Sequence, residues 1–297
     1  WALLGGLMNE RIRAYTYLYP LPDHDIQKFW RSADMAAETA NELVHRGYTA
    51  VKFDPAGPYT MRGGHMPSMY DISISIAFCK AIRDAVGSKA DMLFGTHGQF
   101  NTAGAIRLGQ AIEPYRPLWF EEPIPPDNID EFKRVAKAVR IPIATGERMT
   151  TKAEFAAILK IGGADILQPA LGRAGGLWEV RKIAAIAEVF NAQIAPHLYA
   201  GPIEWAANIH LAVSIPNFLV AESIETTFHN RLIKGSIRVD NGFINAPTDA
   251  GLGIEVDEEF ARAHPFDGKG LHLQMQDEPC DYQSSNSFLG GAPPKKL

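Results

Sequence analysis

The sequence is poor in the features that mark several large classes of protein. Only two of its 297 residues are cysteines, Cys79 and Cys280. Because they lie far apart, neither a disulfide framework nor a thiolate metal site is indicated, and a reducing cytoplasm is the expected location. No apolar run reaches membrane-spanning length, and no basic region precedes an apolar segment near the start, so neither a membrane span nor a signal peptide is expected.

Basic charge is scarce as well. The formal net charge is -5 and the pI is about 6.0, and no basic stripe stands out, so nucleic acid is not expected as a partner. The glycine-rich phosphate fingerprint is missing after the first predicted strand, which disfavours a Rossmann fold. What is present, 46% hydrophobic and 21% charged residues, suits one large globular domain with a small molecule as its partner.

Strands and helices alternate along most of the chain. Hydrophobic periodicity predicts seven strand–helix pairs and an eighth strand. The pairs are 11–19 with 25–46, 50–54 with 69–86, 92–96 with 102–115, 118–121 with 128–140, 143–147 with 152–161, 165–170 with 176–190 and 193–197 with 203–214, and the eighth strand is 218–224, with no evident helix after it. This alternation predicts an α/β fold with right-handed crossovers, in which eight parallel strands close into a single barrel.

Two of the predicted strands end on a carboxylate, Glu121 and Glu147. Side chains alternate along a strand, so Trp119 and Glu121 are predicted to point the same way. Ile143, Thr145 and Glu147 are predicted to share one direction for the same reason. In a closed barrel both acids meet at the C-terminal mouth, where barrel enzymes keep their chemistry. The alternative is that both are solvated loop starts or helix caps.

Alternation predicts a polar set of side chains facing the mouth. They are Lys52, Asp54, Gly95, His97, Glu121, Thr145, Glu147, Gln168, Ala170, His197 and Glu222. Burying such charges without partners is costly, so a cation or an anionic ligand would compensate them. Carboxylates suit Mg²⁺, which could stabilise an enolate, and His97 and His197 could act as acid and base. In the plainer reading the histidines are structural, and Lys52 and Asp54 form an ion pair without chemistry.

Several short motifs stand at these strand ends. They are Trp119-Phe120-Glu121-Glu122-Pro123, Gly146-Glu147-Arg148-Met149, Ile166-Leu167-Gln168-Pro169, Ala174-Gly175-Gly176, Ala195-Pro196-His197 and Gly251-Leu252-Gly253-Ile254. Together they resemble the enolase superfamily and are most similar to its mandelate racemase subgroup, in particular to sugar-acid dehydratases of the galactonate type. The resemblance covers residues 5–256. It implies a modified TIM-type (β/α)7β barrel that binds Mg²⁺.

The resemblance also implies roles for individual residues. Glu121 and Glu147 match two of the family's three metal-binding carboxylates. His197 matches the histidine base of the seventh strand, and His97 matches the general acid of the dehydratases. Glu222 matches the acid of the eighth strand that hydrogen-bonds the substrate carboxylate.

Three positions depart from the family pattern. The third metal carboxylate falls on Gly95, the aspartate that orients the histidine base falls on Ala170, and the lysine of racemases falls on Asp54. Weaker metal binding and a less basic His197 are therefore expected. Asp54 is the candidate for the missing metal oxygen, and Lys52 completes the predicted catalytic set.

The predicted organisation has four parts. Residues 1–10 resemble the last turn of a capping domain, 11–226 form the barrel, 227–276 would pack on the cap, and 277–297 are a disordered tail. The leading hypothesis is a Mg²⁺-dependent hydro-lyase that takes the α proton of a sugar acid and expels the β hydroxyl, leaving a 2-keto-3-deoxy acid. A racemase or epimerase using the same enediolate is one alternative, and a non-catalytic barrel that binds metal or ligand weakly is another. The full-length form is expected to be a homo-oligomer.

Overall fold

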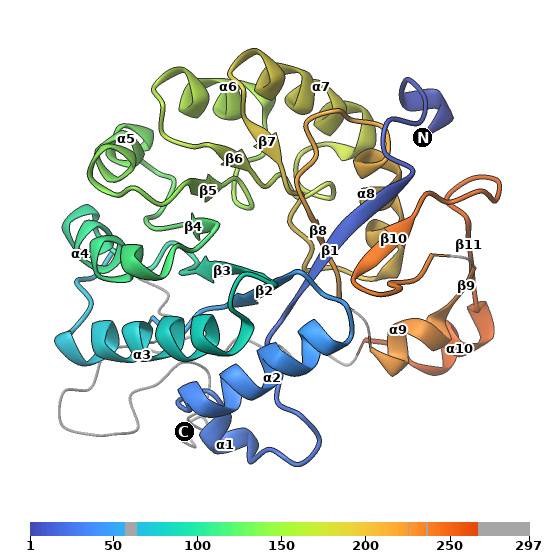
Figure 1. Ribbon diagram of the computed structural model, residues 1–297. Helices are drawn as coiled ribbons and strands as arrows, with labels where there is room; N and C mark the ends of the chain where they lie inside the picture. The colour runs from blue at the N-terminus through green and yellow to red at the C-terminus, as the bar shows by residue number, and fades with distance from the viewer. Residues whose placement is uncertain (57–63, 225, 236, 267–297) are drawn as a thin grey trace.

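The computed structural model describes residues 1–56, 64–224, 226–235 and 237–266, and it contains a barrel of parallel strands ringed by helices (Figure 1). The barrel strands are β1 (Arg11–Tyr17), β2 (Ala50–Phe53), β3 (Asp91–Gly95), β4 (Trp119–Glu121), β5 (Ile143–Thr145), β6 (Ile166–Leu167), β7 (Gln193–Ile194) and β8 (Ala221–Glu222). Strands β1 to β7 pair in parallel in sequence order, and β8 pairs with β1. Ile194 bridges Phe218 just before β8. The ring is thereby closed, and the predicted barrel is confirmed.

Helices fill the connections on the outside of the barrel (Figure 1). They are α1 (Ile26–Phe29), α2 (Ala33–His45), α3 (Met69–Val86), α4 (Thr102–Ile112), α5 (Ile129–Ala138), α6 (Lys152–Lys160), α7 (Gly176–Val189) and α8 (Pro202–Ala212), with short 3-10 helices at Ala2–Leu4 and Glu113–Tyr115. Capping boxes mark two of the starts: Ser68 with Asp71 before α3, and Thr151 with Glu154 before α6. Each box satisfies backbone N–H groups that the first helical turn leaves unpaired.

Two predicted elements were wrong in detail. The single helix predicted over residues 25–46 is two helices, because the Ser32 side chain accepts a hydrogen bond from the Met35 amide at 3.2 Å and starts α2 anew. Serine favours such caps over helix interiors. A helix also follows the eighth strand, where none was evident: α9 (Thr227–Leu232) begins after Thr226, whose side chain accepts from the His229 amide.

The C-terminal segment forms a small unit beside the barrel (Figure 1). It consists of α9 (Thr227–Leu232), β9 (Ile233–Gly235), β10 (Phe243–Asn245), β11 (Ile254–Val256) and α10 (Glu258–Ala263). Strand β10 pairs antiparallel with the start of β1, and β9 pairs antiparallel with β11. The predicted tail over 277–297 and Cys280 lie outside the described residues, while Cys79 is a buried free thiol.

The barrel interior is filled by one side chain from each strand or from the residue directly next to it. They are Tyr15, Ala50, Leu93, Trp119, Ala144, Ile166, Ala195 and Val220, all buried. Tyr15 and Trp119 meet edge to face with their ring centroids 5.5 Å apart, and alanines on three other strands leave room for these two large rings. Alternate residues such as Val51, Phe94 and Ile194 pack outward in the larger core beneath the helices. The next interior position along a strand opens onto the mouth.

The first ten residues lie against α8 rather than over the mouth. The amide of Met8 donates to the carbonyl of Val213 at 2.8 Å, and Asn9 donates to the carbonyls of Ala212 and Ile215. These contacts are at the C-terminal end of α8, which is the end of the barrel away from the mouth. Within the described ranges, no helix has the length and apolar character needed to cross a bilayer.

Gly242 is the second residue of a tight turn before β10, and we expect Gly242→Ala to destabilise the fold by about 2–5 kcal/mol. Its φ is 71°, and a Cβ there would lie 2.2 Å from the carbonyl oxygen of Gly47. The positive φ costs alanine about 1–2 kcal/mol, and the overlap adds about 1–3 kcal/mol. The matched control is Gly162→Ala, at φ 68° with no atom within 4 Å of the new Cβ. Urea unfolding of both variants isolates the steric part, and equal losses would contradict it.

Candidate active site at the barrel mouth

A buried lysine links the strand ends across the mouth. Lys52 from β2 places its Nζ 2.5 Å from Oε1 of Glu121 on β4 and 3.6 Å from Oε1 of Glu222 on β8. Gln168, which follows β6, donates from Nε2 to the other Glu121 oxygen at 2.9 Å. All four side chains are at most 3% exposed. The predicted mouth-facing positions on these strands therefore do converge.

Lys52 is the resident cation of this cluster. Burial lowers the pKa of its ammonium, but Glu121 and Glu222 outweigh burial and hold that pKa well above its usual value. A charged ammonium is therefore kept at neutral pH, and it also lies 4.9 Å from the ring centroid of Tyr17. The alternative pairing of Lys52 with Asp54 is wrong, because Lys52 reaches across the barrel to β4 and β8.

Asp54 instead lies beside His97. The His97 Nδ1 is 3.4 Å from the Asp54 carboxylate, and both side chains are about one-sixth exposed or less. His97 has a φ of 50°, a left-handed conformation unusual for a side chain of this size. Burial lowers the pKa of His97, while Glu147 and Glu121 oppose this shift. The ring is therefore mainly neutral at neutral pH.

His197, after β7, stands between two carboxylates. Its Nδ1 is 3.4 Å from Oε2 of Glu222 and 3.5 Å from Oε2 of Glu147. Glu222 also accepts a hydrogen bond from the Leu198 amide at 2.6 Å, which fixes that carboxylate. Ala170 contributes no carboxylate, as the sequence predicted, but acids from the fifth and eighth strand ends lie where they can orient the imidazole ring.

Glu147 reaches the mouth by a different route from the predicted one. Ala144 is the interior residue of β5, while Ile143 packs outward. The Thr145 hydroxyl donates to Glu122. Ile143 and Thr145 therefore do not share the direction of Glu147. Gly146, at φ 135°, breaks the alternation and turns the following side chain inward.

Burial raises the pKa of Glu147, but His97, His197, Lys52 and Arg148 outweigh it and lower the pKa to about 2.

Two further residues at the strand ends were missed from the sequence, Tyr17 at the mouth and Glu122 next to it. Burial raises the pKa of Tyr17 well above its usual value, and the charges of Asp54, Glu121 and Glu222 raise it further. The phenol therefore stays protonated. Continuing the alternation of Tyr15 to the end of β1 would have found it. Glu122 was missed because it points away from Glu121. Burial, with a further contribution from Glu147, raises the pKa of its carboxyl to about 7.

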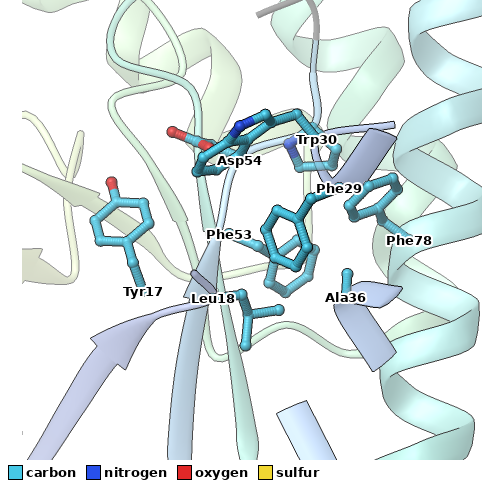
Figure 2. A pocket seen from close by; sticks show the side chains of 9 residues that line it. Tyr17, Leu18, Phe29, Trp30, Ala36, Phe53, Asp54 and Phe78 are labelled. Atoms are coloured by element: carbon cyan, nitrogen blue, oxygen red, sulfur yellow. The ribbon is translucent and has the colours of Figure 1, made fainter. Parts of the chain in front are cut away.

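An aromatic recess adjoins Asp54 (Figure 2). Its cavity volume is only about 20 Å³, and it is lined by Tyr17, Leu18, Phe29, Trp30, Ala36, Phe53, Asp54, Pro55 and Phe78. Phe29, Phe53 and Phe78 are each at most 5% exposed, so their rings belong to the core more than to an open cavity. The recess gives the Asp54 side of the mouth an apolar wall.

The side chains present do not complete a Mg²⁺ site. The predicted ligands Glu121, Glu147 and Asp54 all lie at the mouth, but Lys52 and Gln168 already engage both oxygens of Glu121. In the part of the chain that the structure describes, no group of three or more His, Cys, Asp or Glu side chains is arranged to hold a metal ion. Mg²⁺ needs about six oxygens in near-octahedral geometry, and this donor set falls short of that.

A closed parallel barrel with its ionisable side chains at the strand ends defines an enzyme-type TIM barrel. Residues 34–260 match the family described as enolase C-terminal domain-like. The chain therefore belongs to the enolase superfamily, as the motifs predicted.

Named relatives and solved structures agree with this assignment. The chain is 34% identical over 275 residues to a D-gluconate/D-galactonate dehydratase of Picrophilus torridus, covering 90% of this chain and 66% of that protein. It is 32% identical over 276 residues to a D-xylonate dehydratase of Haloferax volcanii, covering 91% and 66%. A crystal structure of a mandelate racemase/muconate lactonizing enzyme-like protein from Roseovarius sp. TM1035 superposes with a TM-score of 0.92 at 73% identity, covering 95% of this chain and 71% of that one. The chain thus spans just under two thirds of the length of these curated relatives.

Proposed function

We propose that this chain carries the active site of a sugar-acid dehydratase, a hydro-lyase that removes the α proton of an aldonate and expels its β hydroxyl. The observation that carries the proposal is a pair of histidines at one mouth, each beside a carboxylate. Asp54 lies next to His97, and Glu147 and Glu222 lie next to His197. Relatives named as gluconate, galactonate and xylonate dehydratases support the substrate class.

In this proposal His197 is the base. Its Nδ1 faces two carboxylates, which leaves Nε2 to take the α proton, and those carboxylates stabilise the imidazolium that forms. His97, in its protonated form, donates its own proton to the β hydroxyl, which leaves as water. Because the pKa of His97 is lowered, its protonated form is confined to the acidic side of neutrality.

In this proposal Lys52 supplies positive charge near the substrate, and Glu222 orients His197. Lys52 is 1% exposed, so its ammonium acts on a bound acid through its field rather than by direct contact. Positive charge fixed beside the reacting centre stabilises the negative charge that develops when the α proton leaves. Glu222, tied to the Leu198 amide, orients His197 and stands where the resemblance places the acid that contacts the substrate carboxylate.

Members of this superfamily typically use a divalent metal ion, and Mg²⁺ bound at Glu147 and Asp54 would add positive charge next to the substrate carboxylate. Because the donor set is incomplete, no step is assigned to the ion. We expect Gly95→Asp to tighten Mg²⁺ binding at least about tenfold, since a third carboxylate adds a ligand of the preferred type. A Cβ at Gly95 would meet Lys52 and Asp54 at 3.5 and 3.6 Å, which are ordinary contacts.

Titration calorimetry with MgCl₂ on wild type and Gly95→Asp measures this effect. Asn128→Asp, at the N-cap of α5, adds the same charge away from the cluster and should leave the affinity unchanged. Equal affinities in wild type and Gly95→Asp would mean that the added carboxylate pairs with Lys52 instead.

The proposed activity is tested by incubating the chain with D-gluconate, D-galactonate, D-xylonate and further aldonates, with and without Mg²⁺, and assaying 2-keto acid. Formation of 2-keto-3-deoxy acid supports dehydration. An epimer without keto acid would replace the proposal by the epimerase alternative. Binding with neither product would leave the non-catalytic barrel.

We further propose that the mouth packs against another domain, as the family resemblance implies, and that the full-length protein is a homo-oligomer. Exposed apolar side chains occur in the first turns of α3, α7, α8 and α9. They are Met69, Tyr70, Trp178, Ile203 and Phe228, which are 43–62% exposed. Exposed apolar patches favour association, so light scattering should detect self-association of this chain alone. A stable monomer would count against the packing proposal.

A further inference from the structure

Glu122 is a buried carboxyl next to the site that no step above uses. It follows Glu121 at the end of β4, is 0% exposed and has a φ of 45°. Its side chain contacts Thr145 and Gly146 at the end of β5, whereas that of Glu121 contacts Lys52 and Gln168. A left-handed conformation at a residue other than glycine persists only where surrounding contacts hold it.

The carboxylate of Glu122 holds the loop after β5. Its Oε1 accepts a hydrogen bond from the Thr145 hydroxyl at 2.5 Å and another from the Gly146 amide at 2.9 Å. Gly146 is the residue whose φ of 135° turns Glu147 into the mouth. No side chain can replace this glycine, because a Cβ there would lie 2.6 Å from the Phe155 ring.

The backbone of Glu122 holds the loop after β3. Its carbonyl accepts from the Gly98 amide at 2.6 Å and from the Thr96 hydroxyl at 2.6 Å, the two residues that flank His97. Its own amide donates to the carbonyl of Ala144 at 2.9 Å. One residue thus joins the loop that carries His97 to the loop that carries Glu147. Arg148 makes a second link, donating to the His97 carbonyl and lying 3.8 Å from Glu147.

We propose that Glu122 is a positioning residue, which sets the placement of His97 and Glu147 relative to each other through the hydrogen bonds that its oxygens accept. Because Glu147 in turn flanks His197, the acid and the base of the proposed reaction both depend on this junction. The geometry requires an acceptor at Oε1 and does not require a charge. The kinetic part of the inference rests on the proposed function, and the structural part does not.

Two variants separate the acceptor from the charge. Glu122→Gln keeps an oxygen that can accept from Thr145 and Gly146, whereas Glu122→Leu removes it. With D-gluconate or whichever aldonate is turned over, Glu122→Leu should lower kcat about 10²-fold, the effect of misplacing catalytic groups by about 1 Å. KM should change by less than about threefold, because Glu122 is buried and does not touch the substrate. Glu122→Gln should keep kcat within about threefold of wild type.

Amide hydrogen exchange reports on the junction without any substrate. Exchange at Gly146 should speed up about tenfold in Glu122→Leu and stay near the wild-type rate in Glu122→Gln, since a single hydrogen bond is lost in the former. Glu204→Leu is the matched control. Its Oε1 accepts from the Gly172 amide at 3.1 Å, and neither residue is in the proposed catalytic set, so exchange should rise at Gly172 while kcat is unchanged.

Several outcomes overturn the inference. A Gln variant as impaired in kcat as the Leu variant, with normal Gly146 exchange, would show that charge matters and the acceptor does not. Full activity in Glu122→Leu with faster Gly146 exchange would show that the placement is not needed. If Glu122→Leu does not fold, Thr145→Val removes one of the two donors and should give a smaller kcat loss in the same direction, and wild-type kcat there would also overturn it. If wild type turns over no aldonate, the proposed function fails. Hydrogen exchange then tests the structural part alone, and an unchanged exchange rate at Gly146 in Glu122→Leu would contradict the role of Glu122 in holding this loop.

Discussion

Lys52→Met should cost about 3–5 kcal/mol in the free energy of unfolding, the typical result of removing one partner of a buried ion pair. Lys52 is 1% exposed and lies 2.5 Å from Glu121 and 3.6 Å from Glu222. Without the ammonium, two buried carboxylates face each other across the mouth with less compensation. Equilibrium urea unfolding at neutral pH, followed by circular dichroism, measures the loss.

Removing the stranded charge should restore stability. Lys52→Met combined with Glu121→Gln leaves Glu222 as the one remaining carboxylate of the two that paired with Lys52, and Glu222 keeps its hydrogen bond from the Leu198 amide. We therefore expect the double variant to be more stable than the single one. Lys80→Met is the matched control, since Lys80 pairs with Asp84 at 2.5 Å on the exposed side of α3, and exposed pairs of this kind contribute little to stability. A loss in Lys52→Met no larger than in Lys80→Met would contradict a buried pair.

Period-two alternation was enough to predict much of this cluster. Lys52, Glu121, Gln168 and Glu222 each stand two residues after an interior side chain, so the fold carries them to the mouth together once the strands close. The repeated strand–helix pattern predicted that closure. The direction of each of these side chains follows from the alternation along its own strand, so it could be predicted without knowing the conformation of any loop.

The rest depended on geometry that a linear pattern does not contain. Glu147 faces the mouth because Gly146 adopts a φ of 135°, which reverses the parity counted from Ile143. The partner of Lys52 depends on distance across the barrel. Lys52 therefore pairs with Glu121 on β4 and not with Asp54, which is only two residues away in sequence. His197 likewise meets Glu147 and Glu222 from other strands. The break before α2 arises because the Ser32 side chain accepts a hydrogen bond from a backbone amide, in competition with a continuous helix. Helical periodicity alone does not reveal this.

His197→Asn should lower kcat for dehydration of an aldonate by about 10²–10⁴-fold, the usual contribution of a positioned base. Asparagine approximates the shape of the ring but cannot take the proton at neutral pH. In D₂O the variant should also fail to exchange the substrate α proton, which proton NMR follows directly. His264→Asn, on the exposed end of α10, is the control and should change neither rate.

His97→Asn should give a different result, and the difference tests the division of labour between the two histidines. If His97 acts after the α proton has left, its removal should abolish 2-keto acid formation by a similar factor of about 10²–10⁴ while exchange in D₂O continues. The separation rests on placement, because His97 lies on the Asp54 side of the mouth and His197 between Glu147 and Glu222. Loss of exchange in His97→Asn with exchange retained in His197→Asn would reverse the two roles. Loss in both variants would mean that the histidines act as one unit, coupled through Glu147.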